Sequence, residues 1–101
     1  MSRTTTSAEY RLYALAGGPP DRPGLVHVGP GGRAIDVEVY RLPRAAVGDF
    51  LARVAPPLAL GTVTLAGGAE VTGFVCEPRG VAGARDISDF GGWRAYVRTL
   101  E

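Results

Sequence analysis

The sequence lacks several residue types on which common active sites depend. It contains no lysine, asparagine or glutamine, and it has a single cysteine and a single histidine. Without lysine the chain can form neither a Schiff base nor a phosphate loop that relies on lysine. His27 and Cys76 cannot supply the four ligands of a zinc site. We therefore expect no metal centre and no cofactor.

The charges are also sparse and evenly spread. All 11 basic residues are arginine, and with 10 acidic residues they leave a net charge of +1. The arginines are scattered between Arg3 and Arg98 without a run, and nucleic-acid binding requires a concentrated basic patch. No stretch approaches the roughly 18 apolar residues of a membrane span. A lone Cys76 can form no internal disulfide, which is typical of a reducing cytoplasm. We expect a cytoplasmic protein without nucleic-acid or membrane partners.

The 101 residues allow one domain. Residues 1–9 carry no apolar pattern, so we expect a flexible N-terminal tail there and a single domain over 10–101. The 15 glycines and 8 prolines predict many turns and little long regular structure.

Apolar periodicity predicts both strands and helices. Period-two alternation predicts strands at 10–15 and 35–39, and a short strand is expected at 25–28. The string Ala66-Gly-Gly-Ala69 predicts a hairpin between strands at 62–65 and 71–76. Pro43 opens a predicted helix whose apolar stripe consists of Val47, Phe50, Leu51 and Val54. A second short helix, with Asp86 as its cap, is predicted from the spacing of Phe90, Trp93, Val97 and Leu100. Strands without strict alternation with helices indicate an α+β fold with an antiparallel or mixed sheet and two flanking helices.

Seven short strings, in the same order, resemble the C-terminal domain of allophanate hydrolase. They are Tyr10-Arg-Leu-Tyr-Ala-Leu15, Gly17-Gly-Pro-Pro20 with Arg22-Pro-Gly24, Val37-Glu-Val-Tyr-Arg-Leu-Pro43, Pro57-Leu58 with Gly61, Gly73-Phe-Val-Cys-Glu77, Gly83-Ala-Arg-Asp-Ile87 and Phe90-Gly-Gly-Trp-Arg-Ala-Tyr96. No single string is specific, but their order along nearly the whole chain is.

The resemblance implies a small mixed β-barrel similar to γ-glutamylcyclotransferases, set in urea catabolism. In the family an amidase domain deaminates allophanate, and the C-terminal domain processes the product by decarboxylation. Family members carry a histidine-containing strand and loop upstream of the string that begins at Tyr10. Only nine residues precede Tyr10 here, and none is glycine or histidine. We therefore expect this chain to lack that segment.

Two glutamates are candidate proton-handling groups. Glu77 ends a predicted strand, where it can act as a general base or a substrate anchor, or can pair with an arginine such as Arg79 or Arg85. Glu38 lies on the polar face of another strand, where it can line a barrel interior or face solvent. Both readings stay open for each residue.

The candidate substrate-binding residues are Arg22, Tyr13, Gly91 and Gly92. Arg22 can hold a carboxylate in bidentate fashion, or it can be a solvated loop residue. Tyr13 can join Glu38 around a small polar substrate. The N–H groups of Gly91 and Gly92 can face an anion, or the glycines can allow close packing. We expect Glu77, Glu38 and Arg22 to meet at the mouth of the barrel.

Two functions follow from these expectations. The first is a stand-alone domain that binds or acts on a small urea-derived carboxylate or carbamoyl compound, such as N-carboxyurea or allophanate. The second is a non-catalytic interaction module that forms a homodimer or binds an amidase domain, because an open sheet edge is normally covered.

Overall fold

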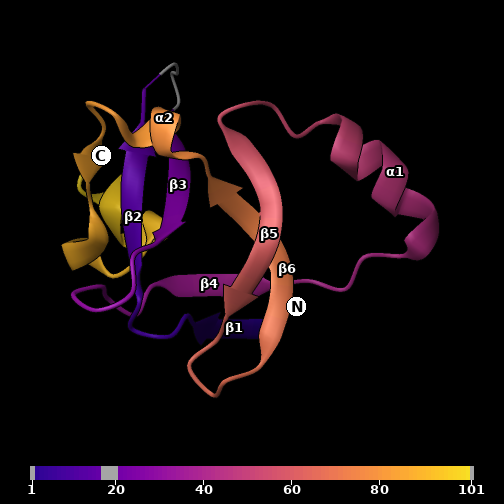
Figure 1. The fold of residues 1–101 in the computed structure, drawn as a ribbon, viewed down its shortest axis with the longest axis horizontal. Helices are drawn as coiled ribbons and strands as arrows, with labels where there is room; N and C mark the ends of the chain where they lie inside the picture. The colour runs from indigo at the N-terminus through magenta and orange to yellow at the C-terminus, as the bar shows by residue number, and fades with distance from the viewer. Residues whose placement is uncertain (1, 17–20, 101) are drawn as a thin grey trace.

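Three small antiparallel sheets make up the body of the protein (Figure 1). The structure is a computed structural model, and it describes residues 2–16 and 21–100. The sheets are formed by β1 (Ser2–Thr5) with β4 (Asp36–Val39), by β2 (Tyr10–Leu15) between β3 (Arg22–His27) and β7 (Arg85–Asp86), and by β5 (Leu58–Thr64) with β6 (Glu70–Cys76). The α+β class and the antiparallel pairing are confirmed. The expected closed barrel is not found in the described ranges, and the γ-glutamylcyclotransferase-like fold is not confirmed.

The N-terminal segment departs from the expected flexible tail over 1–9. Ser2–Thr5 pairs with Asp36–Val39. Thr6 is completely buried, and it exchanges hydrogen bonds with Ile35. The Thr6 N–H donates to the Ile35 carbonyl at 2.9 Å, and the Thr6 hydroxyl accepts the Ile35 N–H at 3.0 Å. A polar sequence can therefore form an ordered strand here because its backbone and its buried hydroxyl are both satisfied.

The hydrophobic core lies where the three sheets meet. Its buried members come from β2, β3 and β5, from the residue that precedes β4, and from the C-terminal segment: Tyr10, Leu12, Ala14, Leu25, Ile35, Val63, Ile87 and Tyr96. Tyr10 is 1% exposed, and its hydroxyl accepts the backbone N–H of Thr64 in β5 at 2.9 Å. The backbone of Tyr10 also bridges to Arg33, on the chain that leads into β4. Tyr10 thus connects β2 to β5 and to the segment before β4.

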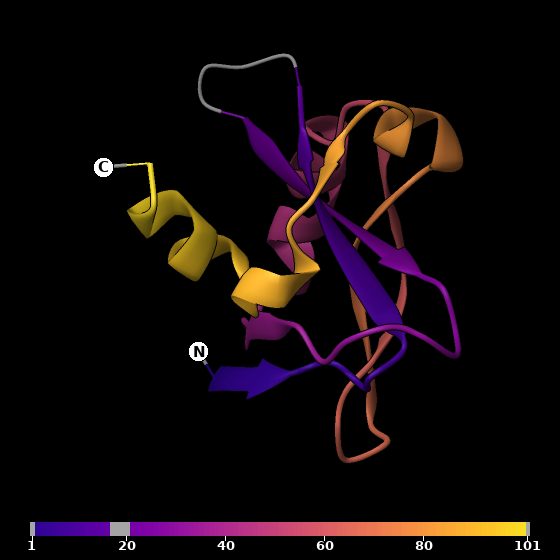
Figure 2. The same cartoon turned by 90° about the vertical axis from the view of Figure 1, so that its left-hand side faces the viewer.

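The helices are short and differ from the two predicted. They are α1 (Arg44–Ala52), α2 (Pro78–Val81), the 3-10 helix η1 (Ser88–Phe90) and α3 (Trp93–Arg98). The predicted C-terminal helix is divided into η1 and α3 by Gly91, whose φ of 86° ends the first of these turns. Asp86 accepts the Ser88 N–H at 2.9 Å and so supports the start of η1. Figure 2 shows α3 on the same side of the molecule as β1.

Helix α1 forms where Pro43 predicts it, but its apolar stripe is not buried as expected. None of the residues of α1 is buried, and Val47, Phe50 and Leu51 are 37%, 38% and 46% exposed. Figure 1 shows α1 standing away from the sheets. Its aromatic contact with the body is that of Phe50 with Phe74 of β6, with ring centroids 5.3 Å apart. The stripe therefore forms an exposed apolar face.

Cys76 ends β6 inside the protein, as the sequence predicts. It is 6% exposed, and its Sγ lies 3.3 Å from the Glu77 carbonyl, to which it donates. Burial raises the pKa of the Cys76 thiol, and the neighbouring Glu77 carboxylate raises it further. The folded protein therefore keeps this thiol protonated and shielded.

Tyr10→Phe should destabilise the protein without changing its fold. The substitution keeps the ring in the core but leaves the N–H of Thr64 without its acceptor, which costs about 1–3 kcal/mol in the free energy of unfolding. Urea denaturation followed by circular dichroism measures this loss. Tyr13→Phe is the control, because no hydrogen bond of the Tyr13 hydroxyl is found in the described part of the chain. Equal stability of Tyr10→Phe and wild type would contradict the role of this hydrogen bond.

Cys76 should react slowly with Ellman's reagent in the folded protein. Near pH 8 we expect the rate to be about tenfold or more below that of the urea-unfolded chain, because the reactive thiolate is both rare and covered. A stopped-flow comparison of the two states measures the ratio. A native rate equal to the unfolded rate would mean that the thiol is accessible.

Candidate functional site

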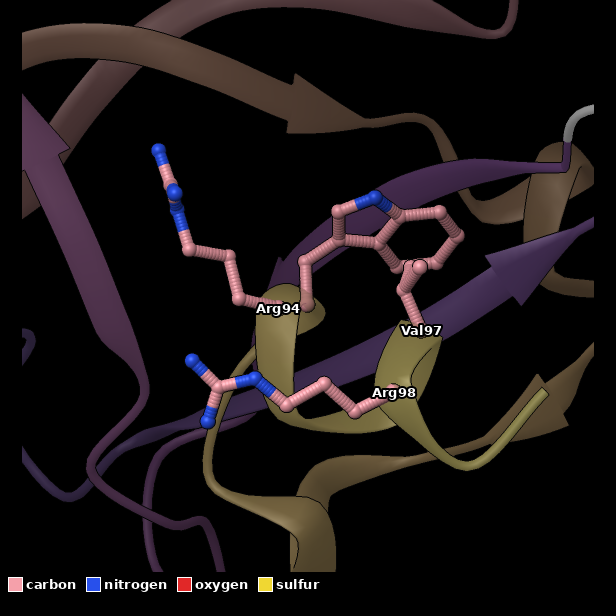
Figure 3. A pocket seen from close by; sticks show the side chains of 4 residues that line it. Arg94, Val97 and Arg98 are labelled. Atoms are coloured by element: carbon pink, nitrogen blue, oxygen red, sulfur yellow. The ribbon is translucent and has the colours of Figure 1, made fainter. Parts of the chain in front are cut away.

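An open hollow of about 260 Å³ lies against the outward side of α3. It is lined by Trp93, Arg94, Val97 and Arg98 (Figure 3). Residues four apart share one face of a helix, so Trp93 lies over Val97 and Arg94 over Arg98. The opposite side of α3 carries Tyr96, which is 5% exposed and belongs to the core. The packing of Tyr96 thus fixes which side chains of α3 face outward.

The hollow combines positive charge with an aromatic surface. Figure 3 shows the side chains of Arg94 and Arg98 extending to the same side of α3. The Trp93 ring is partly buried, and its centroid lies 5.5 Å from that of Tyr96. Arg98 has no carboxylate within ion-pair distance among the described residues. Two guanidinium groups beside an indole are suited to a small planar anion.

Glu38 of β4 does not line the hollow, but it is bonded to Arg94, which does. Its Oε1 accepts hydrogen bonds from Nε of Arg94 at 2.8 Å and lies 2.7 Å from Nη2 of the same guanidinium. Its Oε2 accepts the hydroxyl of Tyr40 at 3.0 Å. The hydrogen bond from Arg94, helped by that from Tyr40, lowers the pKa of Glu38 below its usual range. Glu38 is therefore an anion at neutral pH and is poorly suited to donate a proton.

Glu77 lies at the other end of the molecule. It directly precedes α2, which is near the top of Figure 1, whereas β4 with Glu38 is near the bottom. Its Oε1 accepts a hydrogen bond from Arg79 at 3.0 Å. This pair is the structural alternative that the sequence left open for Glu77.

Arg22 lies at the same end as Glu77. It begins β3, and its charge, like that of Glu77, acts on the thiol of Cys76. Tyr13 is in the middle of β2, opposite Gly24 and Asp86 of the neighbouring strands. The structure therefore brings Arg22 near Glu77 but does not bring Glu38 to them. The catalytic and binding roles of these residues stay predictions.

The glycine pair before α3 is explained by a close backbone approach. The Gly91 carbonyl accepts the Asp36 N–H at 2.7 Å, and the Gly91 N–H donates to the Ser88 carbonyl at 3.0 Å. A Cβ on Gly92 would lie 2.8 Å from the Cβ of Asp36. The pair joins the start of β4 to α3, and the N–H of Gly91 is already used within the protein.

Arg94 and Arg98 are not among the site residues predicted from the sequence. The feature that could have indicated them is their spacing of four residues, which matches the spacing of Trp93 and Val97 and places all four on one side of a helix. That helix was predicted from its apolar residues alone.

In the described ranges, no group of three or more histidine, cysteine, aspartate or glutamate side chains could hold a metal ion. No helix there is long and apolar enough to cross a membrane.

Comparisons with known proteins agree with the resemblance found in the sequence. Residues 1–98 match the family described as allophanate hydrolase C-terminal domain. The urea amidolyase of Saccharomyces cerevisiae is 40% identical over 105 residues, which cover all of this chain and 6% of that protein. The urea amidolyase of Lachancea kluyveri is 41% identical over 100 residues, again 6% of its length. The chain thus spans a small part of these relatives.

Solved structures match over the same extent. The allophanate hydrolase of Kluyveromyces lactis has a TM-score of 0.96 and 42% identity, and the match covers all of this chain and 17% of that one. The Escherichia coli protein c4763, described as specific to uropathogenic strains, has a TM-score of 0.86 and 35% identity over 96% of this chain and 74% of its own. On the extent and the identity of these matches, the chain belongs to the allophanate hydrolase C-terminal domain family.

Proposed function

We propose that the chain binds a small urea-derived carboxylate in the hollow on α3, as a module of allophanate metabolism. The observation that supports this proposal is the pair of guanidinium groups, Arg94 and Arg98, beside Trp93 in one hollow. The relatives are named urea amidolyase and allophanate hydrolase, which makes the carboxylates of urea catabolism the first ligands to consider. A cytoplasmic location is part of the proposal.

The charge of the hollow matches a dicarboxylate. Allophanate is urea with a carboxylate on one nitrogen, and hydrolysis of its amide by an amidase releases ammonia and leaves a nitrogen that bears two carboxylates. Each carboxylate can accept charge-assisted hydrogen bonds from one guanidinium. A planar ligand of this size can also lie against the indole of Trp93.

Binding is better supported than proton transfer. Decarboxylation breaks a C–N bond, leaves the electron pair on nitrogen and requires a proton there. Because Glu38 is held as an anion by Arg94, it is a poor source of that proton. Glu77 is bonded to Arg79, close to α2 and away from the hollow. A binding role therefore requires only groups that already line the hollow.

Malonate should bind to the wild-type chain and bind less well after either arginine is removed. In malonate a CH₂ group replaces the NH of the proposed dicarboxylate, so the probe is stable in solution. We expect Arg94→Ala and Arg98→Ala each to raise the Kd about fivefold or more, because each removes a charge-assisted hydrogen-bonding group. Isothermal titration calorimetry at low salt measures the Kd.

Arg79→Ala is the matched control, because it removes an arginine whose partner is Glu77. Its Kd should equal that of wild type. No binding of malonate to a folded wild-type chain, or equal binding by all three variants, would overturn the proposal.

A second candidate function is assembly, and the exposed apolar face of α1 favours it. This face consists of Val47, Phe50 and Leu51, with Phe74 packed against Phe50. Monomeric proteins seldom leave such a cluster uncovered. Phenylalanine, which this face presents at two positions, is enriched in the cores of protein–protein interfaces.

The charges around this face favour an acidic partner over a second copy of the chain. Arg41, Arg44 and Arg53 are exposed along the segment that carries the face, and Asp49 is the acidic residue of that segment. Two such faces would bring like charges together, which opposes self-association. We propose an allophanate-hydrolysing amidase with an acidic rim around an apolar patch, rather than the homodimer expected from the sequence.

Leu51→Ser should weaken binding to the amidase encoded by the same organism. We expect the Kd, measured by biolayer interferometry, to rise about tenfold, because one apolar anchor is lost from the interface. Val28→Ser, which alters an exposed valine just after β3, should leave the Kd unchanged. Light scattering of the chain alone should give the mass of a monomer. If wild type is a dimer and Leu51→Ser is a monomer, the face of α1 binds a second copy of the chain and not the amidase.

A further inference from the structure

Arg94, which lines the hollow on α3, is already bonded to a carboxylate of the protein itself. Both nitrogens that Arg94 directs toward β4, Nε and Nη2, lie within 2.8 Å of Oε1 of Glu38. The other carboxylate oxygen is bonded to the Tyr40 hydroxyl. Glu38 thus occupies the hydrogen-bonding atoms that an incoming carboxylate would use.

We propose that Glu38 is a built-in competitor for ligand carboxylates at Arg94. This inference rests on the proposed function of the hollow. A ligand first engages Arg98, and its second carboxylate then replaces Glu38 on the guanidinium of Arg94. Glu38 therefore weakens the binding of a ligand whose second carboxylate needs Arg94, and it leaves the binding of a ligand that engages Arg98 alone unchanged.

The unequal exposure of the pair supports an exchange at Arg94. The Arg94 side chain is 64% exposed, whereas that of Glu38 is 23% exposed. Arg94 is therefore reachable from solvent while it is bonded to Glu38. An ion pair this exposed is weak enough for an anionic ligand to compete with it.

Glu38 keeps other polar partners when its bond to Arg94 is broken. Arg3 of β1 lies opposite Glu38 in the strand register, and its charge acts on the same carboxylate. Tyr40, which directly follows β4, keeps its hydrogen bond to Oε2. When Arg94 turns to a ligand, Glu38 therefore still faces one cation and one hydroxyl donor, so that it is not left as an isolated charge.

Glu38→Gln tests the proposal because it removes the charge and keeps the shape. We expect the Kd for malonate to fall about threefold, the size of effect that an exposed ion pair allows. Tyr40→Phe, which removes a bond that holds Glu38 in place, should lower the Kd by a smaller factor. Glu70→Gln is the matched control, because it makes the same charge change at an exposed position of β6 and should leave the Kd unchanged.

Two further measurements separate competition from a structural effect. The Nε–H signal of Arg94 in ¹⁵N NMR should shift on malonate binding in wild type, as its acceptor changes from Glu38 to the ligand. Acetate, which needs only Arg98, should bind wild type and Glu38→Gln about equally.

The outcomes are distinguishable from those that test the hollow itself. If wild type binds malonate through Arg94 and Arg98 but Glu38→Gln binds equally or more weakly, the competitor is refuted and the binding site stands. The same applies if Glu70→Gln strengthens binding as much. If folded wild type does not bind malonate, both proposals fail.

Discussion

The structure depends on the burial of Tyr10 at the junction of three sheets. Each sheet has only two or three strands, and a sheet of this size has too little apolar surface to be stable alone. The Tyr10 ring fills the space between them, and its hydroxyl accepts the N–H of Thr64. Thr6 does the same for Ile35 through its backbone and its hydroxyl. Two polar side chains in the interior therefore hold together elements that are far apart in the sequence.

The candidate site is a consequence of this core. Tyr96 packs into it, which fixes the rotation of α3 and turns Arg94 and Arg98 outward. The close approach of Gly92 to Asp36 fixes the distance between α3 and the start of β4, two residues before Glu38. The ion pair of Glu38 with Arg94 is therefore held by contacts of the backbone as well as by its own charges.

The sequence predicted the local elements better than their arrangement. Alternation located β2, the glycine-containing turn signal at residues 66–69 located the hairpin of β5 and β6, and Pro43 located the start of α1, because these signals act within a few residues. Ser2–Thr5 was missed because it has no apolar alternation, and its order comes from pairing with β4 and from the burial of Thr6. Whether the sheets close into a barrel depends on contacts between sheets, which alternation within a strand does not record.

The same distinction explains the site residues. The contact of Glu77 with Arg79, two residues away, was one of several alternatives that the sequence left open, beside pairing with Arg85 and a role in substrate binding or catalysis. The partner of Glu38 was not, because Arg94 is 56 residues away and lies on a helix whose rotation only the core determines. A glutamate on the polar face of a strand looks the same in the sequence whether it meets solvent or an arginine.

The two candidate functions are compatible because they use different parts of the surface. In Figure 1, α1 stands on the opposite side of β5 and β6 from the C-terminal segment that carries α3. A partner that covers the apolar face of α1 would therefore leave the hollow on α3 open. If that partner is an amidase that produces the dicarboxylate, docking would raise the local concentration of the ligand near Arg94 and Arg98. A ligand released at high local concentration does not require tight binding, and this is consistent with a hollow whose arginine is already partly occupied by Glu38.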